Sequence, residues 1–150
     1  MGREAPVIVI ADTSGIIASI DRSCRDHKQA REVMDAAGLV VIAPLVFAEL
    51  DHLVSRRFGQ QAAGAVIDQL LTHARSGRYA IGETGADVLS DARLTQRRYR
   101  DLDLDLTDAV ITVLAREYAT DAVLTLDRKD FRTIRPLSPH DAFRLLPDDL

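Results

Sequence analysis

The sequence predicts an α/β fold in which a central, mostly parallel β-sheet is flanked by helices. Short apolar runs rich in β-branched residues recur along the chain, and longer segments with helical periodicity lie between them. The strand-like runs are apolar throughout rather than alternating, which is typical of parallel strands covered on both faces. Because the chain has 150 residues, enough for a substantial core, we expect one domain over 1–150.

Five elements are predicted in the first half of the chain. They are a strand over 6–11, a helix over 27–37, a strand over 39–42, a helix from Pro44 to about Arg57, and a helix over 60–75. Glycines follow two of these helices, Gly38 and Gly59, at a position where glycine commonly ends a helix. Pro44 is compatible with a first helical turn, because the amide hydrogen that proline lacks has no partner there.

Five further elements are predicted in the second half. They are a short strand over 79–81, a helix over 85–100, a helix over 108–118, a strand over 122–126, and an edge strand with an irregular tail over 134–150. Thr107 is the predicted N-cap of the helix over 108–118. That helix is apolar nearly all round, so we expect it to be buried.

Composition excludes several classes of protein. A hydrophobic content of 47% is too high for a disordered chain. No apolar run approaches the roughly 20 residues of a membrane span, so no membrane association is expected. The first six residues lack the apolar stretch of a signal peptide. The single cysteine, Cys24, excludes an internal disulfide framework and fits a reducing compartment, so we expect a cytoplasmic protein.

The charge distribution is uneven. A net charge of −4 argues against a general nucleic-acid coat protein, which would be basic. The basic residues are nevertheless grouped locally: Arg56 and Arg57, then Arg93, Arg97, Arg98 and Arg100, then Arg128, Lys129 and Arg132. Each group either contacts a partner or only solubilises a helix face.

Four acidic residues lie where apolar segments meet loops or helix ends: Asp12, Glu49, Asp108 and Asp127. Asp12 and Asp127 follow predicted strands, and ligands of parallel sheets bind beyond the carboxyl ends of the strands. We therefore expect the four acids to converge at one edge of the sheet. Carboxylates beside apolar runs are costly without a cation. Four of them without matching basic residues indicate a hard divalent ion such as Mg²⁺ or Mn²⁺, which could activate water against a phosphate.

Each acid also has a purely structural interpretation. Asp12 could cap a helix that begins at Thr13, and Glu49 could pair with Arg56. Asp108 could be only a favourable charge at a helix N-terminus, and Asp127 a turn residue.

Neighbouring acids leave further alternatives. Asp130 is a second candidate for the final acid, but Asp127 is preferred because it directly follows the strand. Asp101, Asp103 and Asp105 alternate with leucines, and we expect them in a solvated loop rather than in the site.

The pattern as a whole resembles PIN-domain ribonucleases of the VapC toxin type, over roughly residues 7–137. Four segments carry the resemblance: the opening strand into Asp12-Thr13-Ser14, Pro44 to Leu50, Thr107-Asp108-Ala109, and Leu124 to Phe131. The resemblance implies a PIN-like domain in which Asp12, Glu49, Asp108 and Asp127 hold catalytic Mg²⁺ or Mn²⁺. It places Thr13 or Ser14, and Thr125, beside the metal.

The resemblance also implies a substrate and partners. The substrate would be tRNA or ribosomal RNA, and a cognate antitoxin protein would occlude the site. Homodimers are common among such toxins. The arginines of 93–100 are candidates for contact with RNA or antitoxin.

Two other functions compete with this interpretation. An aspartyl phosphatase of the haloacid-dehalogenase kind also begins with an Asp after a strand, but it requires a second Asp two positions later. This chain has Ser14 there. The other alternative is a PIN-like interaction module without catalytic activity, which the presence of all four acids disfavours.

Overall fold

Five parallel strands form one central sheet in the computed structural model, which describes residues 7–150. The strands are β1 Ile8–Ala11, β2 Leu39–Ile42, β3 Tyr79–Ile81, β4 Ala122–Leu124 and β5 Arg144–Leu146. Their order across the sheet is β3-β2-β1-β4-β5, and all four pairings are parallel. Since Val9 of β1 pairs with Val40 on one side and Ala122 on the other, β1 is the central strand.

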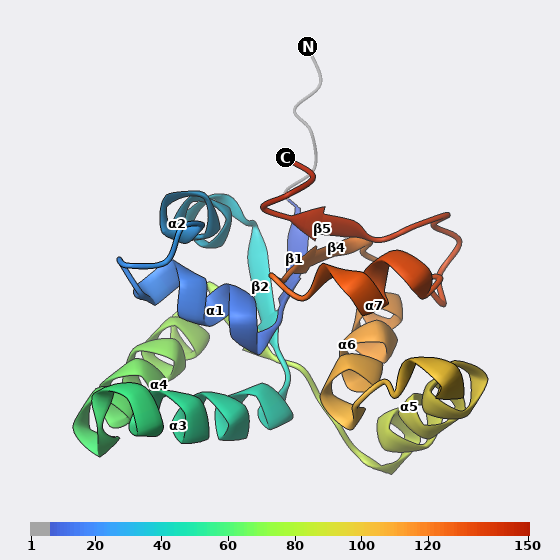
Figure 1. Ribbon diagram of the computed structural model, residues 1–150, viewed down its shortest axis with the longest axis horizontal. Helices are drawn as coiled ribbons and strands as arrows, with labels where there is room; N and C mark the ends of the chain where they lie inside the picture. Colours follow the sequence, from blue (N-terminus) through green and yellow to red (C-terminus); the bar gives the residue numbers. More distant parts are fainter. Residues whose placement is uncertain (1–6) are drawn as a thin grey trace.

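Helices cover the sheet in two groups (Figure 1). In that view α1 to α4, blue to green, lie mainly to the left of β1 and β2, while α5 to α7, yellow to orange, lie to their right, with α7 below β4 and β5. The helices are α1 Thr13–Ile20, α2 His27–Ala36, α3 Pro44–Phe58, α4 Gln60–Arg75, α5 Ala86–Arg98, α6 Leu106–Glu117 and α7 Arg128–Thr133, with a short 3₁₀ turn, η1 Arg100–Leu102. No helix within residues 7–150 combines the length and the apolar character needed to cross a membrane.

The hydrophobic core lies between the sheet and these helices. Ile10, Val41 and Leu124 from three neighbouring strands are fully buried. On α6 every residue from Thr107 to Ala115 is buried, as its apolar sequence predicts. Burial of each such aliphatic side chain stabilises the fold by roughly 1.5–3 kcal/mol.

Helix α1 packs so closely against the end of β4 that only glycine fits at one position. A Cβ atom on Gly15 would lie 2.5 Å from the carbonyl oxygen of Leu124. This approach brings the N-terminal turn of α1 against the carboxyl end of β4. It thereby places Asp12, the residue that precedes α1, beside the segment that follows β4.

The predicted fold class is confirmed, and most element boundaries agree within two residues. Three predictions of detail are wrong. The helix predicted over 85–100 ends at Arg98 and is followed by η1, and the strand predicted over 122–126 ends at Leu124. The N-cap of α6 is Asp105 rather than Thr107.

Other elements were not predicted or cannot be compared. Helices α1 and α7 were not predicted as elements. Pro6, the first residue of the predicted opening strand, and the rest of the leader segment 1–6 lie outside the described residues.

Candidate metal centre

An open cleft of about 380 Å³ lies beyond the carboxyl ends of the central strands. All four acids singled out in the sequence line it, although they are far apart along the chain. The acidic residues that line the cleft are Asp12, Asp21, Glu49, Asp105, Asp108 and Asp127. The structure therefore brings together the four predicted carboxylates and adds two that sequence reasoning did not place there.

Asp12 lies between β1 and α1, and both of its carboxylate oxygens accept hydrogen bonds. Oδ1 accepts from the backbone N–H of Thr13 at 2.7 Å, and Oδ2 accepts from the hydroxyl of Thr125 at 2.9 Å. The side chain caps α1, as the structural interpretation proposed, and it also faces the cleft. The two interpretations of this residue are therefore compatible.

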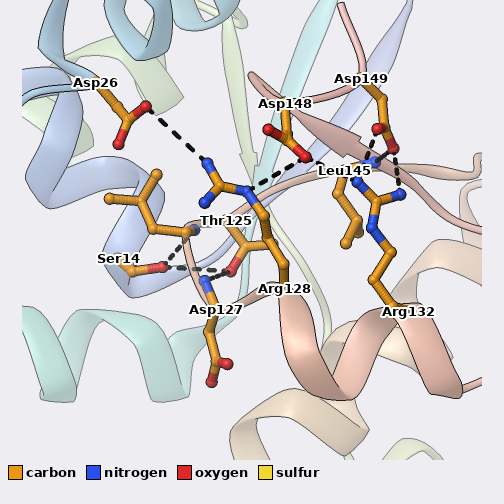
Figure 2. A network of polar contacts seen from close by, with 10 residues as sticks. Ser14, Asp26, Thr125, Asp127, Arg128, Arg132, Leu145, Asp148 and Asp149 are labelled. Atoms are coloured by element: carbon orange, nitrogen blue, oxygen red, sulfur yellow. Dashed lines mark hydrogen bonds and ion pairs between the residues drawn. The ribbon is translucent and has the colours of Figure 1, made fainter.

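Threonine and serine hydroxyls connect the segments around the site. The Thr13 hydroxyl donates to Glu49 Oε2 at 3.0 Å, so Glu49 is held by α1 and shows no ion pair with Arg56. Ser14 Oγ accepts from the backbone N–H of Leu126, and Thr125 Oγ1 accepts from the backbone N–H of Asp127 (Figure 2). These bonds fix the chain between β4 and α7, where Asp127 lies.

Asp108 occupies the third residue of α6 and is only 7% exposed. Its backbone N–H donates to Asp105 Oδ1 at 2.8 Å. Asp105 was expected in a solvated loop, and this expectation is wrong in part: its side chain is exposed but caps α6 and lines the cleft. Asp105 and Asp108 are three positions apart, which is the spacing of an N-cap and the third residue of a helix. This spacing was the signal in the sequence that Asp105 caps α6 and lies beside Asp108. Asp101 and Asp103 are not among the cleft-lining residues of the described chain.

Three carboxylates form the tightest acidic group. One oxygen each from Asp108, Asp127 and Asp130 lies within 4.8 Å of the other two. Asp130 is the third residue of α7, and Asp127 precedes that helix. The sequence favoured Asp127 over Asp130 as the final acid, whereas the structure places both beside Asp108.

Burial and repulsion from neighbouring acids disfavour ionisation of Asp12, Asp108 and Asp130. Burial, opposed by the hydrogen bonds from Thr125 and Thr13 and reinforced by the charge of Glu49, raises the pKa of Asp12 to about 6. Burial, reinforced by the charges of the surrounding acids, raises the pKa of Asp108 to about 8. The pKa of Asp130 is also raised, first by burial and then by Asp127.

The donor set fits a hard divalent cation. None of the ion pairs formed among residues 7–150 involves Asp12, Glu49, Asp108, Asp127 or Asp130. Clustered carboxylate oxygens without a basic partner are the ligands that Mg²⁺ and Mn²⁺ take in proteins. A divalent charge at this position would offset the repulsion that raises the pKa of Asp108.

The arginines of α7, Arg128 and Arg132, extend away from Asp127 and hold the helix in place through other acids of the chain (Figure 2). Arg132 forms two 2.7 Å contacts with the Asp149 carboxylate near the C-terminus. Arg128 lies 3.7 Å from Asp148 and 4.0 Å from Asp26. The third basic group of the sequence is therefore largely engaged with acids of the same chain, and it anchors the helix that carries Asp130.

Comparison with known proteins identifies the fold and its family. The PIN domain family matches residues 9–135. Over 130 residues the sequence is 36% identical to Ribonuclease VapC26 of Mycobacterium tuberculosis, a match that covers 86% of this chain and 93% of that protein. The chain therefore belongs to the PIN-domain family, among its VapC-type ribonucleases, and the predicted resemblance is confirmed. This membership removes the aspartyl-phosphatase alternative.

Solved structures share the fold at lower identity. The Mycobacterium tuberculosis toxin VapC20, described as cleaving the sarcin–ricin loop, superposes with a TM-score of 0.70 at 22% identity, covering 79% of this chain and 89% of that chain. VapBC2 of Rickettsia felis, solved with a DNA fragment from its promoter, has a TM-score of 0.65 at 18% identity, covering 88% of this chain and 96% of that chain. These similarities extend over most of each chain.

Proposed function

We propose that this protein is a Mg²⁺- or Mn²⁺-dependent endoribonuclease and the toxin component of a VapBC toxin–antitoxin system. The observation that carries the proposal is the group of Asp108, Asp127 and Asp130 oxygens within 4.8 Å of one another, in a cleft that Asp12 and Glu49 also line. Membership among VapC-type ribonucleases supports the reaction class.

In this proposal Asp12, Glu49, Asp108 and Asp127 are the catalytic metal-binding residues, and Asp130 is a further candidate ligand. These residues would hold a divalent ion, which would supply a more acidic water molecule and a positive charge beside the reacting phosphate. The chain itself supplies the alignment. Thr13 and Thr125 hold Asp12 from two sides, and Thr13 also orients Glu49. The N-terminal end of α6 adds a positive dipole beside Asp108.

The proposed substrates are tRNA or ribosomal RNA. VapC20 is described as a toxin that cleaves the sarcin–ricin loop, which supports a structured RNA as the substrate class here. The chain has no Trp and only seven Phe or Tyr residues, so an extended base-stacking platform is not expected. Recognition would then depend on metal ions, arginines and the shape of the RNA.

The proposed protein partner is a cognate antitoxin that covers the acidic cleft. VapBC2 of Rickettsia felis and a toxin–antitoxin complex from Klebsiella pneumoniae have similar folds, which supports this class of partner. We also propose that two copies of the chain associate and that the protein acts in the cytoplasm, where the single free thiol of Cys24 would stay reduced.

Cleavage of total cellular RNA tests the proposed function. Purified protein with Mn²⁺ should release discrete fragments, and EDTA or the Asp108→Asn substitution should abolish them. Because Asp108 forms no side-chain ion pair that folding requires, the variant should still fold. Fragments that persist at the wild-type rate in the variant would contradict the site assignment. If neither cleavage nor a Mn²⁺-dependent rise in melting temperature is observed, the protein is instead a non-catalytic interaction module.

A further inference from the structure

Helices α1 and α3 lie side by side (Figure 1), and residues of both helices line the same cleft. The cleft-lining residues recur every four positions: Thr13, Ile17 and Asp21 along α1 and its C-cap, and Glu49, Leu53 and Arg57 along α3. Residues four apart lie on one face of a helix. The two series therefore line the same stretch of the cleft, which leads away from the metal-site acids.

Hydrogen bonds join the two series at both ends of this stretch of the cleft. At the acidic end the Thr13 hydroxyl donates to Glu49 at 3.0 Å. At the far end Arg57 Nη2 donates to Asp21 Oδ2 at 3.2 Å. Arg57 follows Glu49 by eight positions, which corresponds to about 12 Å along the helix axis. Between them lie the apolar side chains of Ile17 and Leu53, the latter 40% exposed.

Arg57 is the one basic side chain among the described residues that line this cleft, which also contains six acids. RNA is a polyanion, so the acidic end can approach it only through bound cations. Arg57 is the position at which the chain itself offers a phosphate a positive charge. Arginine suits that role because its planar guanidinium can donate two parallel hydrogen bonds to phosphate oxygens.

The guanidinium of Arg57 is held toward the cleft but is not fully engaged. It lies 5.2 Å from the ring centroid of Phe58 and contacts Asp21 through Nη2 alone. Asp21 does not depend on this contact, because its Oδ1 accepts from the backbone and hydroxyl of Ser23 at 3.0 and 2.6 Å. The Arg57 side chain is 56% exposed, whereas that of Asp21 is only 10% exposed, so the guanidinium is accessible to a ligand from the solvent side of this pair.

We propose that Arg57 forms a phosphate-binding subsite for the RNA strand, separate from the metal centre. It binds a phosphate neighbouring the one that reacts, while Ile17 and Leu53 contact the ribose or base between them. In the free protein Asp21 holds the guanidinium in a binding orientation, and RNA phosphate replaces that carboxylate. This inference rests on the proposed ribonuclease function and assigns part of its substrate recognition to one side chain.

Steady-state kinetics of Arg57→Gln against Arg56→Gln test the subsite. Arg56 is the adjacent arginine of α3, is exposed and does not line the cleft, so it controls for loss of one charge. The substrate is a synthetic RNA oligonucleotide that spans a cleavage site mapped in total RNA.

Loss of one charge-assisted phosphate contact should raise KM roughly tenfold for Arg57→Gln, with kcat little changed. The slope of log(kcat/KM) against log salt concentration should become shallower by roughly 0.7, the value for one phosphate of a single strand. Arg56→Gln should have the same KM and the same salt slope as the wild type. Arg57→Lys should keep the salt slope, because its charge is retained, and have an intermediate KM.

Identical kinetics for Arg57→Gln and Arg56→Gln, with the wild type active, would overturn this inference and leave the proposed function standing. The same holds if Arg57→Gln weakens only antitoxin binding, because Arg57 would then serve a protein partner. If the wild-type protein cleaves no RNA, the proposed function fails, and the subsite fails with it.

Discussion

Asp108 should make the metal-free protein less stable as the pH rises, and its replacement by asparagine should remove that effect. The side chain is only 7% exposed. Burial and the neighbouring acids raise its pKa from the model-compound value of 3.8 to about 8. The folded state therefore holds a proton that the unfolded chain releases. Its contribution to stability is fully present below the unfolded pKa and is lost as the pH rises toward the folded pKa.

The size of the effect follows from proton linkage. One proton retained on folding changes the free energy of unfolding by about 1.4 kcal/mol per pH unit. Between about pH 5 and about pH 7, Asp108 alone should therefore lower the stability of the metal-free protein by roughly 3 kcal/mol. The pKa of Asp12 is raised to about 6, so Asp12 also lowers the stability of the metal-free protein as the pH rises over the lower part of that range.

Urea unfolding in EDTA across this pH range measures the effect. The wild-type protein should lose stability from about pH 5 to about pH 7, and Asp108→Asn should lose roughly 3 kcal/mol less. Asp101→Asn is the matched control, because Asp101 is an exposed acid that does not line the cleft, and it should follow the wild type. Parallel curves for the wild type and Asp108→Asn would refute the reasoning. Added Mn²⁺ should restore stability near neutral pH in the wild type only.

Two further predictions concern the acids beside Asp108 and the packing of α1 on β4. Asp127 and Asp130 both place an oxygen within 4.8 Å of a carboxylate oxygen of Asp108. Asp127→Asn and Asp130→Asn should therefore each weaken Mn²⁺ binding, measured by calorimetry, by tenfold or more. This corresponds to the loss of one charged contact, on the order of 1–3 kcal/mol. Wild-type affinity in Asp130→Asn would restrict the site to the four acids chosen from the sequence. A Gly15→Ala substitution should destabilise the protein by roughly 1–3 kcal/mol in urea unfolding, because the added methyl group meets the Leu124 carbonyl. Gly64→Ala, in helix α4 with open space around it, should instead be stabilising by roughly 0.5–1 kcal/mol, and equal effects of the two substitutions would contradict the packing argument.

The sheet and the longer helices were predictable because their signals are local. Strands β1, β2 and β4 are buried on both faces and have continuous apolar sequences. The acids that follow two of these strands could be assigned to one edge, since parallel strands end together. Asp12 and Asp127 do line one cleft in the structure.

Other features depend on packing between distant segments and have weak local signals. Helix α1 contains Gly15 and three isoleucines, a poor helical sequence in isolation. It is stabilised by the cap from Asp12 and by close packing on Leu124. Helix α7 has only six residues, too few for periodicity to show.

The alignment of α1 with α3 is likewise invisible in the sequence. Thr13 and Glu49 are 36 positions apart, as are Asp21 and Arg57. Neither pair follows a motif, because the register of two packed helices is set by their side chains in three dimensions.

The candidate metal centre lies between the two helix groups that flank the sheet. Asp12 and Glu49 belong to the α1 and α3 side, while Asp108, Asp127 and Asp130 belong to the α6 and α7 side (Figure 1). Threonine hydroxyls hold Asp12 and Glu49, whereas the carboxylates of the second group repel one another. A divalent cation bound by acids of both groups would therefore connect α6 and α7 to the hydrogen-bonded acids beside α1 and α3.

Helix α7 should show this coupling most clearly, because it has only six residues and its ion pairs with Asp148 and Asp149 lie on the side away from the metal-site acids. Hydrogen exchange measures it directly. Mn²⁺ should slow exchange of the amides in 128–134 more than those of α4, which carries no ligand and serves as the internal control. Uniform protection of both helices would mean that the ion acts only by raising global stability, and that α7 is already fixed without it.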